Sequence, residues 1–242
     1  MKTAAALVIG NELLSGKIAD ANLVVLARTL RAVGVQLRRA VVVLDEIEAI
    51  VTEIQALSAA HDWLFTSGGV GPTHDDLTIE AVARAFGVAV VTDAHLTDML
   101  RGYYGERLTE SHMLMARVPQ GARLVSSESI PWPAVVMRNA WVLPGVPEIF
   151  QAKQPLIRAE LAGGAPFVSL SVLTTLDEGQ LKPMLDRVVE AHRDVAIGSY
   201  PRWSDAEYRT RLTFDGLKEE RVREARDAFA ASLPEGTLVR VE

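Results

Sequence analysis

Residues 66–80 read Thr-Ser-Gly-Gly-Val-Gly-Pro-Thr-His-Asp-Asp-Leu-Thr-Ile-Glu, a glycine-rich loop that continues into two aspartates. The apolar run at 62–66 predicts a short buried strand, and the helical spacing of apolar residues from Ile79 to Phe86 predicts a helix that ends at Gly87. Glycines let a ligand approach the main chain, and the start of a helix supplies unpaired N–H groups and a positive dipole end. We therefore expect this loop to bind an anionic group such as a phosphate.

The two aspartates, Asp75 and Asp76, distinguish this loop from better-known phosphate loops. The pattern GxxxxGK[ST] needs a lysine and a hydroxyl after the last glycine, and GxGxxG needs a third glycine where this chain has His74. Carboxylates beside a phosphate would repel it unless a cation stood between them, so we infer a divalent metal shared by carboxylate and phosphate. The alternative is that Asp76 only caps the helix. His74 is expected to be loop surface rather than a metal ligand.

The composition is that of an ordinary globular protein. With 242 residues and 49% hydrophobic content, the chain can bury a sizeable core. Its net charge of -6, without a block of basic residues, argues against a nucleic-acid partner. The absence of cysteine excludes disulfides, thiolate metal sites and cysteine nucleophiles. No apolar run approaches membrane-spanning length, and the run at 4–9 is too short for a signal peptide, so we expect a cytoplasmic location and no membrane partner.

Strand and helix patterns alternate along the first part of the chain. Strands are expected at 4–9, 36–44, 62–66, 89–91, 134–138 and 140–143, and helices at 23–33, 47–57, 79–86, 96–103 and 148–161. This alternation predicts an α/β fold with a mostly parallel sheet and helices on both faces. Prolines and glycines punctuate 105–133, where we expect loops with short pieces of structure and no chemistry.

A change of composition at 162–166, Ala-Gly-Gly-Ala-Pro, predicts a domain boundary. We expect a first domain at 1–164 and a second at 165–242. The patterns in the second part follow the order strand, helix, strand, strand, helix, strand. This βαββαβ order predicts a small α+β domain.

Polar residues follow several of the predicted strands, and in an open parallel sheet ligands bind at the carboxyl ends of the strands. The candidate ligand-binding and phosphate-binding residues are Gly10, Asn11, Glu12, Ser67, Gly68, Gly69, Gly71, Thr73, Thr78, Pro144 and Gly145. Asp45 follows the second strand, so Asp45, Asp75 and Asp76 are the candidate metal ligands. Asp45 and Asp76 are also the candidate catalytic residues, because a carboxylate here can orient an attacking water.

Several of these residues have simpler structural readings. Asp20 is expected to cap the first helix, with ligand contact as the alternative role. Residues 144–148 either line the site or only make a tight turn before a helix that starts with proline. Ser67 and Thr73 have no evident base partner, so the sequence does not support a Ser-His-Asp type of nucleophile.

Three stretches resemble a known family. Residues 9–16 (Ile-Gly-Asn-Glu-Leu-Leu-Ser-Gly), 67–78 and 143–148 (Leu-Pro-Gly-Val-Pro-Glu) resemble the MoaB/Mog-type molybdopterin-binding domain, and more closely its branch in the N-terminal half of competence/damage-inducible protein CinA. Residues 177–178 and 198–204 (Gly-Ser-Tyr-Pro-Arg-Trp-Ser) are similar to the tail of the molybdopterin-binding-like domain in eukaryotic FAD synthases. The resemblance covers nearly the whole chain and implies a MoaB/Mog-like fold.

The resemblance implies one of two activities at the carboxyl ends of the strands, where the candidate residues lie. The CinA and FAD-synthase branch implies a hydrolase that cleaves the pyrophosphate bond of a nucleotide such as ADP-ribose or FAD with Mg, Mn or Co. The molybdenum-cofactor branch implies a protein that binds molybdopterin as its ligand or transfers an adenylyl group to it. A non-catalytic ligand-binding module is the third possibility. We predict the nucleotide pyrophosphatase, in a homo-oligomer because related domains self-associate.

The same resemblance matches individual residues to the family pattern. Asp76 stands at the family's motif aspartate before the threonine, and Asp45 at the aspartate after the second strand. The family usually has aspartate where this chain has Asn11, and the lost charge is expected to weaken a metal site or to change the ligand.

Overall fold

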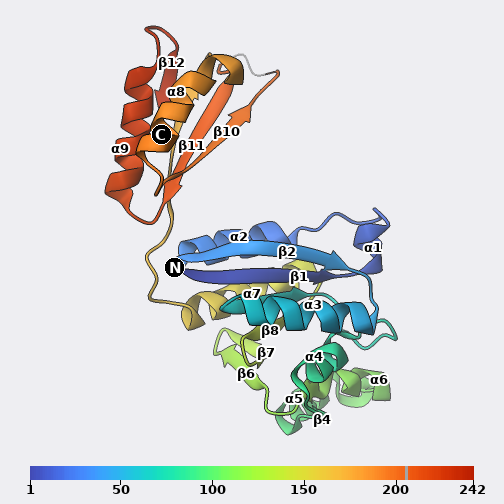
Figure 1. Cartoon of the computed structure of the whole chain (residues 1–242). Helices are drawn as coiled ribbons and strands as arrows, with labels where there is room; N and C mark the ends of the chain where they lie inside the picture. Colours follow the sequence, from blue (N-terminus) through green and yellow to red (C-terminus); the bar gives the residue numbers. More distant parts are fainter. Residues whose placement is uncertain (205–206) are drawn as a thin grey trace. The chain divides into compact units, whose positions relative to one another are not determined.

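The computed structural model describes residues 1–204 and 207–242, which fold into two compact units, Met1–Gly164 and Ala165–Glu242 (Figure 1). The elements of the first unit are β1 (Lys2–Ile9), α1 (Asn11–Leu14), α2 (Asn22–Ala32), β2 (Val35–Val43), α3 (Ile47–Ala60), β3 (Trp63–Ser67), α4 (Thr78–Phe86), β4 (Val90–Thr92), α5 (Ala94–Tyr104), η1 (Gly105–Arg107), α6 (Glu110–Met113), η2 (Leu114–Ala116), β5 (Arg117–Pro119), β6 (Arg123–Ser127), β7 (Ile130–Met137), β8 (Ala140–Leu143) and α7 (Pro147–Glu160).

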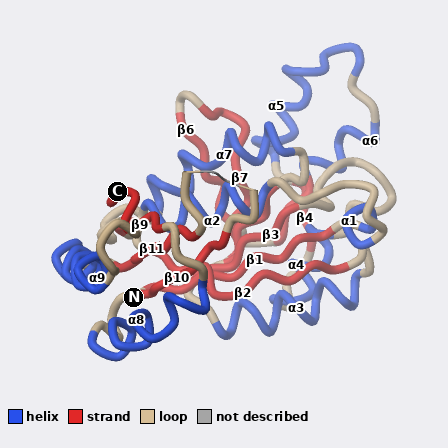
Figure 2. The backbone as a smooth tube through the Cα atoms, turned by 90° about the horizontal axis from the view of Figure 1, so that it is seen from above, coloured by secondary structure: helices blue, strands red, loops and turns tan. Residues whose placement is uncertain are grey.

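The main sheet of the first unit has six strands in the order β2-β1-β3-β8-β7-β6. The neighbours from β2 to β8 pair in parallel, and β7 pairs antiparallel with both β8 and β6. Figure 2 shows β2, β1 and β3 running side by side. The predicted α/β fold with a mostly parallel sheet is confirmed. The carboxyl ends of the parallel strands and the start of β7 therefore lie along one edge of the sheet.

Helices cover both faces of this sheet, which explains why its central strands are apolar without alternation. Along β1, Ala4 and Ala6 pack in one core with α2 and α7, while Ala5 and Leu7 pack in the other core with α3 and α4. Successive side chains of a strand point to opposite faces, so both sets are buried. Trp141 of β8 fills the first core and is completely buried.

A small third core lies beside the sheet in the segment 94–135, which includes the stretch 105–133, where loops with short pieces are expected from the sequence. The fully buried residues of this core are Leu96, Leu100, Ala116 and Val118. The short strands β4 and β5 pair antiparallel next to it, and β6 with the first part of β7 joins the main sheet. The segment is therefore more regular than predicted.

The second unit contains β9 (Val168–Thr174), α8 (Glu178–Ala191), β10 (Ala196–Pro201), β11 (Thr210–Gly216), α9 (Glu219–Ser232) and β12 (Leu238–Val241). Its four strands form an antiparallel sheet in the order β10-β11-β9-β12, in the predicted βαββαβ sequence of elements. Phe214 and Phe229 are completely buried in a core that belongs to this unit alone. Among the helices of the described residues, none is long and apolar enough to cross a membrane.

The core on the α3 side allows a first test of the packing. Ile54 is completely buried there, so we expect Ile54→Ala to lower the free energy of unfolding by about 2–5 kcal/mol through lost transfer energy and a cavity. Thr52→Ala, an exposed position of the same helix, should change it by less than about 0.5 kcal/mol. Urea denaturation followed by tryptophan fluorescence measures both, and equal effects would contradict the assigned core face.

Candidate functional site

The loops after β1, β3 and β8 meet at Gly68. Its N–H donates to the carbonyl oxygen of Leu143 at 3.1 Å, and a Cβ added to Gly68 would lie 2.2 Å from the carbonyl oxygen of Ile9. Gly145 also packs tightly against this point, since its own Cβ would lie 3.2 Å from the Cα of Gly68. Gly68 also has a φ of 106°, which a residue with a side chain rarely adopts. Only glycine fits at this junction.

Thr78 holds the loop after β3 against the start of α4. Its hydroxyl donates to the carbonyl oxygen of Gly68 at 2.8 Å, and its N–H donates to the carbonyl oxygen of Gly69 at 2.9 Å. The residue is completely buried and does not line the cavity described below. The expected ligand-binding role of Thr78 is therefore corrected to a structural one.

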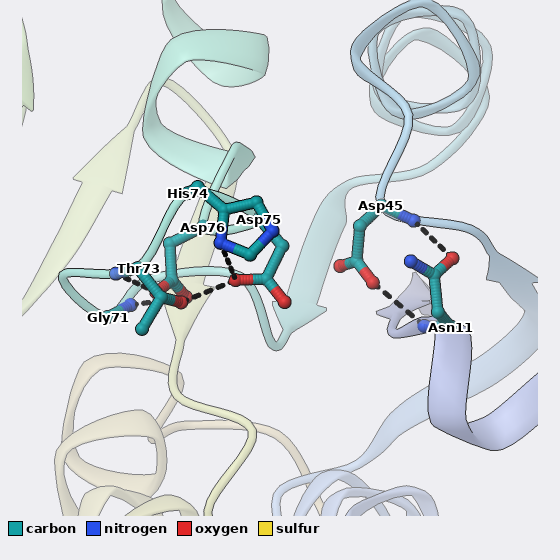
Figure 3. A network of polar contacts seen from close by, with 7 residues as sticks. All are labelled: Asn11, Asp45, Gly71, Thr73, His74, Asp75 and Asp76. Atoms are coloured by element: carbon teal, nitrogen blue, oxygen red, sulfur yellow. Dashed lines mark hydrogen bonds and ion pairs between the residues drawn. The ribbon is translucent and has the colours of Figure 1, made fainter.

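Asp76 closes the glycine-rich loop with its carboxylate. Its Oδ1 accepts from the N–H of Gly71 at 2.6 Å, and its Oδ2 accepts from the N–H and the hydroxyl of Thr73 at 2.7 and 2.5 Å (Figure 3). The helix α4 begins at Thr78, and no side chain of the preceding residue Leu77 caps it. The alternative in which Asp76 only caps the helix is wrong, because its carboxylate binds the main chain of its own loop.

Asp75 lies next to this network and shares it through one hydroxyl. The Thr73 hydroxyl is 2.5 Å from an oxygen of Asp75 and 2.5 Å from an oxygen of Asp76, although it has a single proton to donate. Hydrogen bonding from this hydroxyl is the main cause that lowers the pKa of Asp75. The side chain of His74 is 98% exposed and its Nδ1 lies 3.9 Å from Asp75, which agrees with the expected surface position.

Asp45 and Asn11 form a reciprocal pair on the facing loops (Figure 3). The N–H of Asn11 donates to Oδ2 of Asp45 at 2.8 Å, and the N–H of Asp45 donates to Oδ1 of Asn11 at 3.2 Å. Burial raises the pKa of Asp45, the Asn11 N–H lowers it, and repulsion from Glu12, Asp75 and Asp76 raises it further. The charges acting on Asp45 are thus all negative, which is an environment that favours a bound cation.

These groups border one large cavity of about 1040 Å³ in the first unit. The predicted site residues that line it are Gly10, Glu12, Asp45, Ser67, Gly68, Gly69, Gly71, Thr73, Asp75, Asp76, Pro144 and Gly145. Asn11 and Thr78 are the two predicted residues that do not. Asn22 holds two of the loops together, because its amide nitrogen donates to Ser67 Oγ at 2.9 Å and to the Gly145 carbonyl at 2.8 Å.

The structural alternatives for Asp20 and for the turn at 144–148 have different outcomes. Asp20 accepts from the N–H of Leu23 at 2.8 Å, so its favoured capping role at the start of α2 is confirmed, although it also lines the cavity. Pro147 starts α7 as expected. Because Pro144 and Gly145 border the cavity, this turn also shapes the site rather than only starting a helix.

A large part of the cavity wall comes from residues that the sequence analysis did not identify. These residues are mostly apolar or aromatic and include Leu96, Met99, Leu100, Tyr103, Tyr104, Leu114, Met115, Arg117, Pro131, Trp132, Pro133 and Lys153. Six of them fall within 105–133, a stretch in which the sequence analysis places no site residue. The signals that point to them are the adjacent tyrosines at 103 and 104 and a tryptophan between two prolines.

The donor set fits a cation only if the ligand completes it. No group of three or more histidine, aspartate or glutamate side chains at 1–204 and 207–242 is arranged to hold a metal ion by itself. Oδ1 of Asp45 accepts no hydrogen bond from these same residues, and the side chain of Asp75 is 52% exposed, so both carboxylates are accessible to a ligand. Since Mg²⁺ commonly binds through one or two carboxylates together with phosphate oxygens, this set fits a metal shared with a phosphorylated ligand.

Comparison with known proteins gives two family matches. The model described as probable molybdopterin binding domain matches residues 5–157, and the model described as FAD synthase, middle domain, matches residues 166–242. A probable FAD synthase from Caenorhabditis elegans is 31% identical over 90% of this chain and 47% of its own length. A CinA-like protein from Myxococcus xanthus is 38% identical over 63% of this chain and 39% of its own length. The chain thus spans about half the length, or less, of these relatives.

A solved structure shows the same fold for the first unit. The crystal structure of the protein CinA with unknown function from Thermoplasma acidophilum covers 66% of this chain and 98% of its own, with a TM-score of 0.61 and 28% sequence identity.

The environment of Asp45 gives a second test. The pKa of Asp45 is higher in the folded protein than in the unfolded chain, so the folded protein binds the carboxyl proton more tightly. The free energy of unfolding therefore falls as pH rises from the pKa of the unfolded chain through the pKa of the folded protein. Near neutral pH we therefore expect Asp45→Asn to raise the melting temperature by about 1–3 °C. Near pH 3, where the carboxyl is protonated in both states, the gain should vanish.

Thermal denaturation at both pH values measures this effect, with Glu235→Gln on the exposed surface of the second unit as the matched control. A gain of the same size at both pH values, or a loss at neutral pH, would show that the ionised Asp45 does not carry the inferred electrostatic penalty.

Proposed function

The chain belongs to the probable molybdopterin binding domain family, and from this premise we propose that its first unit hydrolyses the pyrophosphate bond of a nucleotide of the ADP-ribose or FAD type with a divalent cation. The observation that carries the proposal is the meeting of two features in one cavity. One is a loop that presents main-chain N–H groups, and the other is a set of carboxylates that repel one another.

The loop offers donors for a phosphate. Within the described chain, the N–H groups of Gly69 and Val70 have no hydrogen-bond partner, and both residues line the cavity. Gly145 and Val146 line it from the neighbouring loop, just before the start of α7, where backbone N–H groups are also unpaired. Backbone amides and a helix N-terminus together suit a phosphate oxygen.

Each carboxylate has a role set by its partners. Asp45 and Asp75, whose carboxylates are accessible at the cavity, would hold the cation, and the cation would neutralise phosphate charge and polarise the phosphoryl oxygen. Asp45 also orients a water for attack, since burial and its neighbours make it the more basic carboxylate. Asp76 positions the loop that binds the phosphate, because its oxygens are already bonded to Gly71 and Thr73.

The apolar part of the cavity suits a flat ring system. Met99, Tyr104, Met115 and Trp132 contribute to this wall, and Tyr104 is stacked on the ring of His112 with centroids 3.8 Å apart. A mostly apolar cavity with a few convergent polar groups is the usual form of a cofactor site. A nucleotide places its phosphates and its ring in such a cavity at the same time.

The alternative function is the binding or adenylylation of molybdopterin, which the description of the matching family favours. The same cavity accepts a pterin ring and a phosphate. The two functions differ in chemistry, because the alternative requires no hydrolysis of a nucleotide. A non-catalytic binding module is the remaining outcome, and it would bind such ligands without turnover.

Hydrolysis of ADP-ribose and FAD with Mg²⁺, Mn²⁺ or Co²⁺ tests the proposal. We expect the wild type to release mononucleotides, and Asp45→Asn, which keeps the shape and the acceptor for Asn11, to lower the rate by about 100-fold or more. Asp76→Asn should lower it too, with a rise in KM, because an amide NH2 replaces one of the two oxygens that accept hydrogen bonds from the loop. Glu235→Gln should leave the rate unchanged. Full activity of Asp45→Asn would contradict the proposal, and molybdopterin binding without turnover would favour the alternative.

A further inference from the structure

Lys153 of α7 is a buried lysine that lines the cavity. Its side chain is 3% exposed, and its ammonium group donates to the carbonyl oxygen of Trp132. This carbonyl is its single hydrogen-bond partner among residues 1–204 and 207–242, and no carboxylate of these residues pairs with it. An ammonium group has three N–H donors, so two remain for another acceptor.

No charged side chain of the described residues balances the charge of Lys153. A buried cation next to a neutral carbonyl is unfavourable unless an anion compensates it. Burial lowers the pKa of Lys153 to about 8, with no charged side chain contributing, and this value still leaves most of the group charged near neutral pH. The other basic side chain of the cavity wall, Arg117, lies 3.3 Å from Glu80 and is thereby balanced.

The sheet places this lysine beside the loop that follows β8 and away from Asp45. Val135 of β7 pairs with Val142 of β8, so the residues before it, Trp132 included, come level with the loop that follows β8. Asp45 follows β2, which is four strands from β7 in the sheet order. With strands about 4.8 Å apart, Asp45 and Lys153 lie toward opposite ends of this edge of the sheet.

We propose that Lys153 is an anion-binding residue of this cavity, whose ammonium group balances a phosphoryl group of the ligand on the side of β8 and β7. The inference rests on the proposed function only in requiring a phosphorylated ligand, and it holds whether or not that ligand is hydrolysed. The rival reading is that Lys153 merely ties α7 to the start of β7 through the Trp132 carbonyl.

The proposal implies a pH dependence of binding. A bound anion stabilises the charged form of Lys153. The affinity for the anion is therefore highest below the pKa that Lys153 has in the ligand-free protein, and it falls as pH rises through about 8. A variant without the amine should lack this component. The purely structural role predicts no such dependence, because the Trp132 carbonyl is uncharged.

Calorimetry with α,β-methylene-ADP and Mg²⁺ tests the proposal, since this probe carries phosphoryl groups but its P–C–P bridge cannot be hydrolysed. At about pH 7 we expect Lys153→Met to bind it about tenfold or more weakly and Lys153→Arg to retain most of the affinity. The ratio of wild-type to Lys153→Met affinity should shrink between about pH 7 and pH 9. Equal affinities with parallel pH profiles, or no binding by the wild type, would overturn the proposal.

A second measurement on the wild type covers the case in which Lys153→Met does not fold. The probe should protect Lys153 from an amine-reactive label severalfold, as read by mass spectrometry, while Lys182 of α8 reacts unchanged. Equal labelling of Lys153 with and without the probe would overturn the proposal. Failure of the proposed function is a different result, in which ADP-ribose and FAD are not hydrolysed although binding still depends on Lys153.

Discussion

The close approach of main chain to main chain at Gly68 is the constraint on which the site depends. The strand ends of β1, β3 and β8 can meet there because no side chain stands between Gly68 and the carbonyl of Ile9. Once Gly68 is fixed, its own carbonyl accepts from the Thr78 hydroxyl, which sets where α4 begins. The turn between them must then pass over the cavity, and this leaves the N–H groups of Gly69 and Val70 without protein partners.

Two aspartates that look equivalent in the sequence have different roles because their donors differ. Asp76 accepts from two N–H groups and a hydroxyl, so its charge is used to close the loop. Asp45 accepts from a single N–H group and faces three other carboxylates, so part of its charge remains uncompensated. Under the proposed function, a cation would be attracted mainly to the side of Asp45, while the loop bound by Asp76 would stay in place for the phosphate. One aspartate would then shape the loop and the other would attract the metal.

The fold was predictable where burial produces a regular pattern. The apolar run that forms β1 is buried on both faces, and Gly87 ends α4 in the left-handed conformation that glycine favours. The pattern fails at 105–133, because those apolar residues serve both a small core and a cavity wall and so follow neither helical nor strand spacing. The partner of Asp76 was not predictable either, since an aspartate before a helix has the same local signature whether it caps the helix or binds its own loop. Nothing local to Lys153 indicates that this lysine, unlike the exposed ones, is buried.

Asn11 illustrates how a lost charge changes a site without changing its shape. Its amide oxygen accepts from the N–H of Asp45, and its own N–H donates to that carboxylate, so an aspartate at this position would keep both hydrogen bonds. An aspartate would, however, add a fifth carboxylate to a group in which Asp45 already faces Glu12, Asp75 and Asp76. Asparagine thus relieves repulsion in the empty site and weakens its attraction for a cation. Under the proposed function, the ligand's phosphate would then have to supply more of the negative charge, so cation and nucleotide binding would be more strongly coupled than in a site with aspartate at this position.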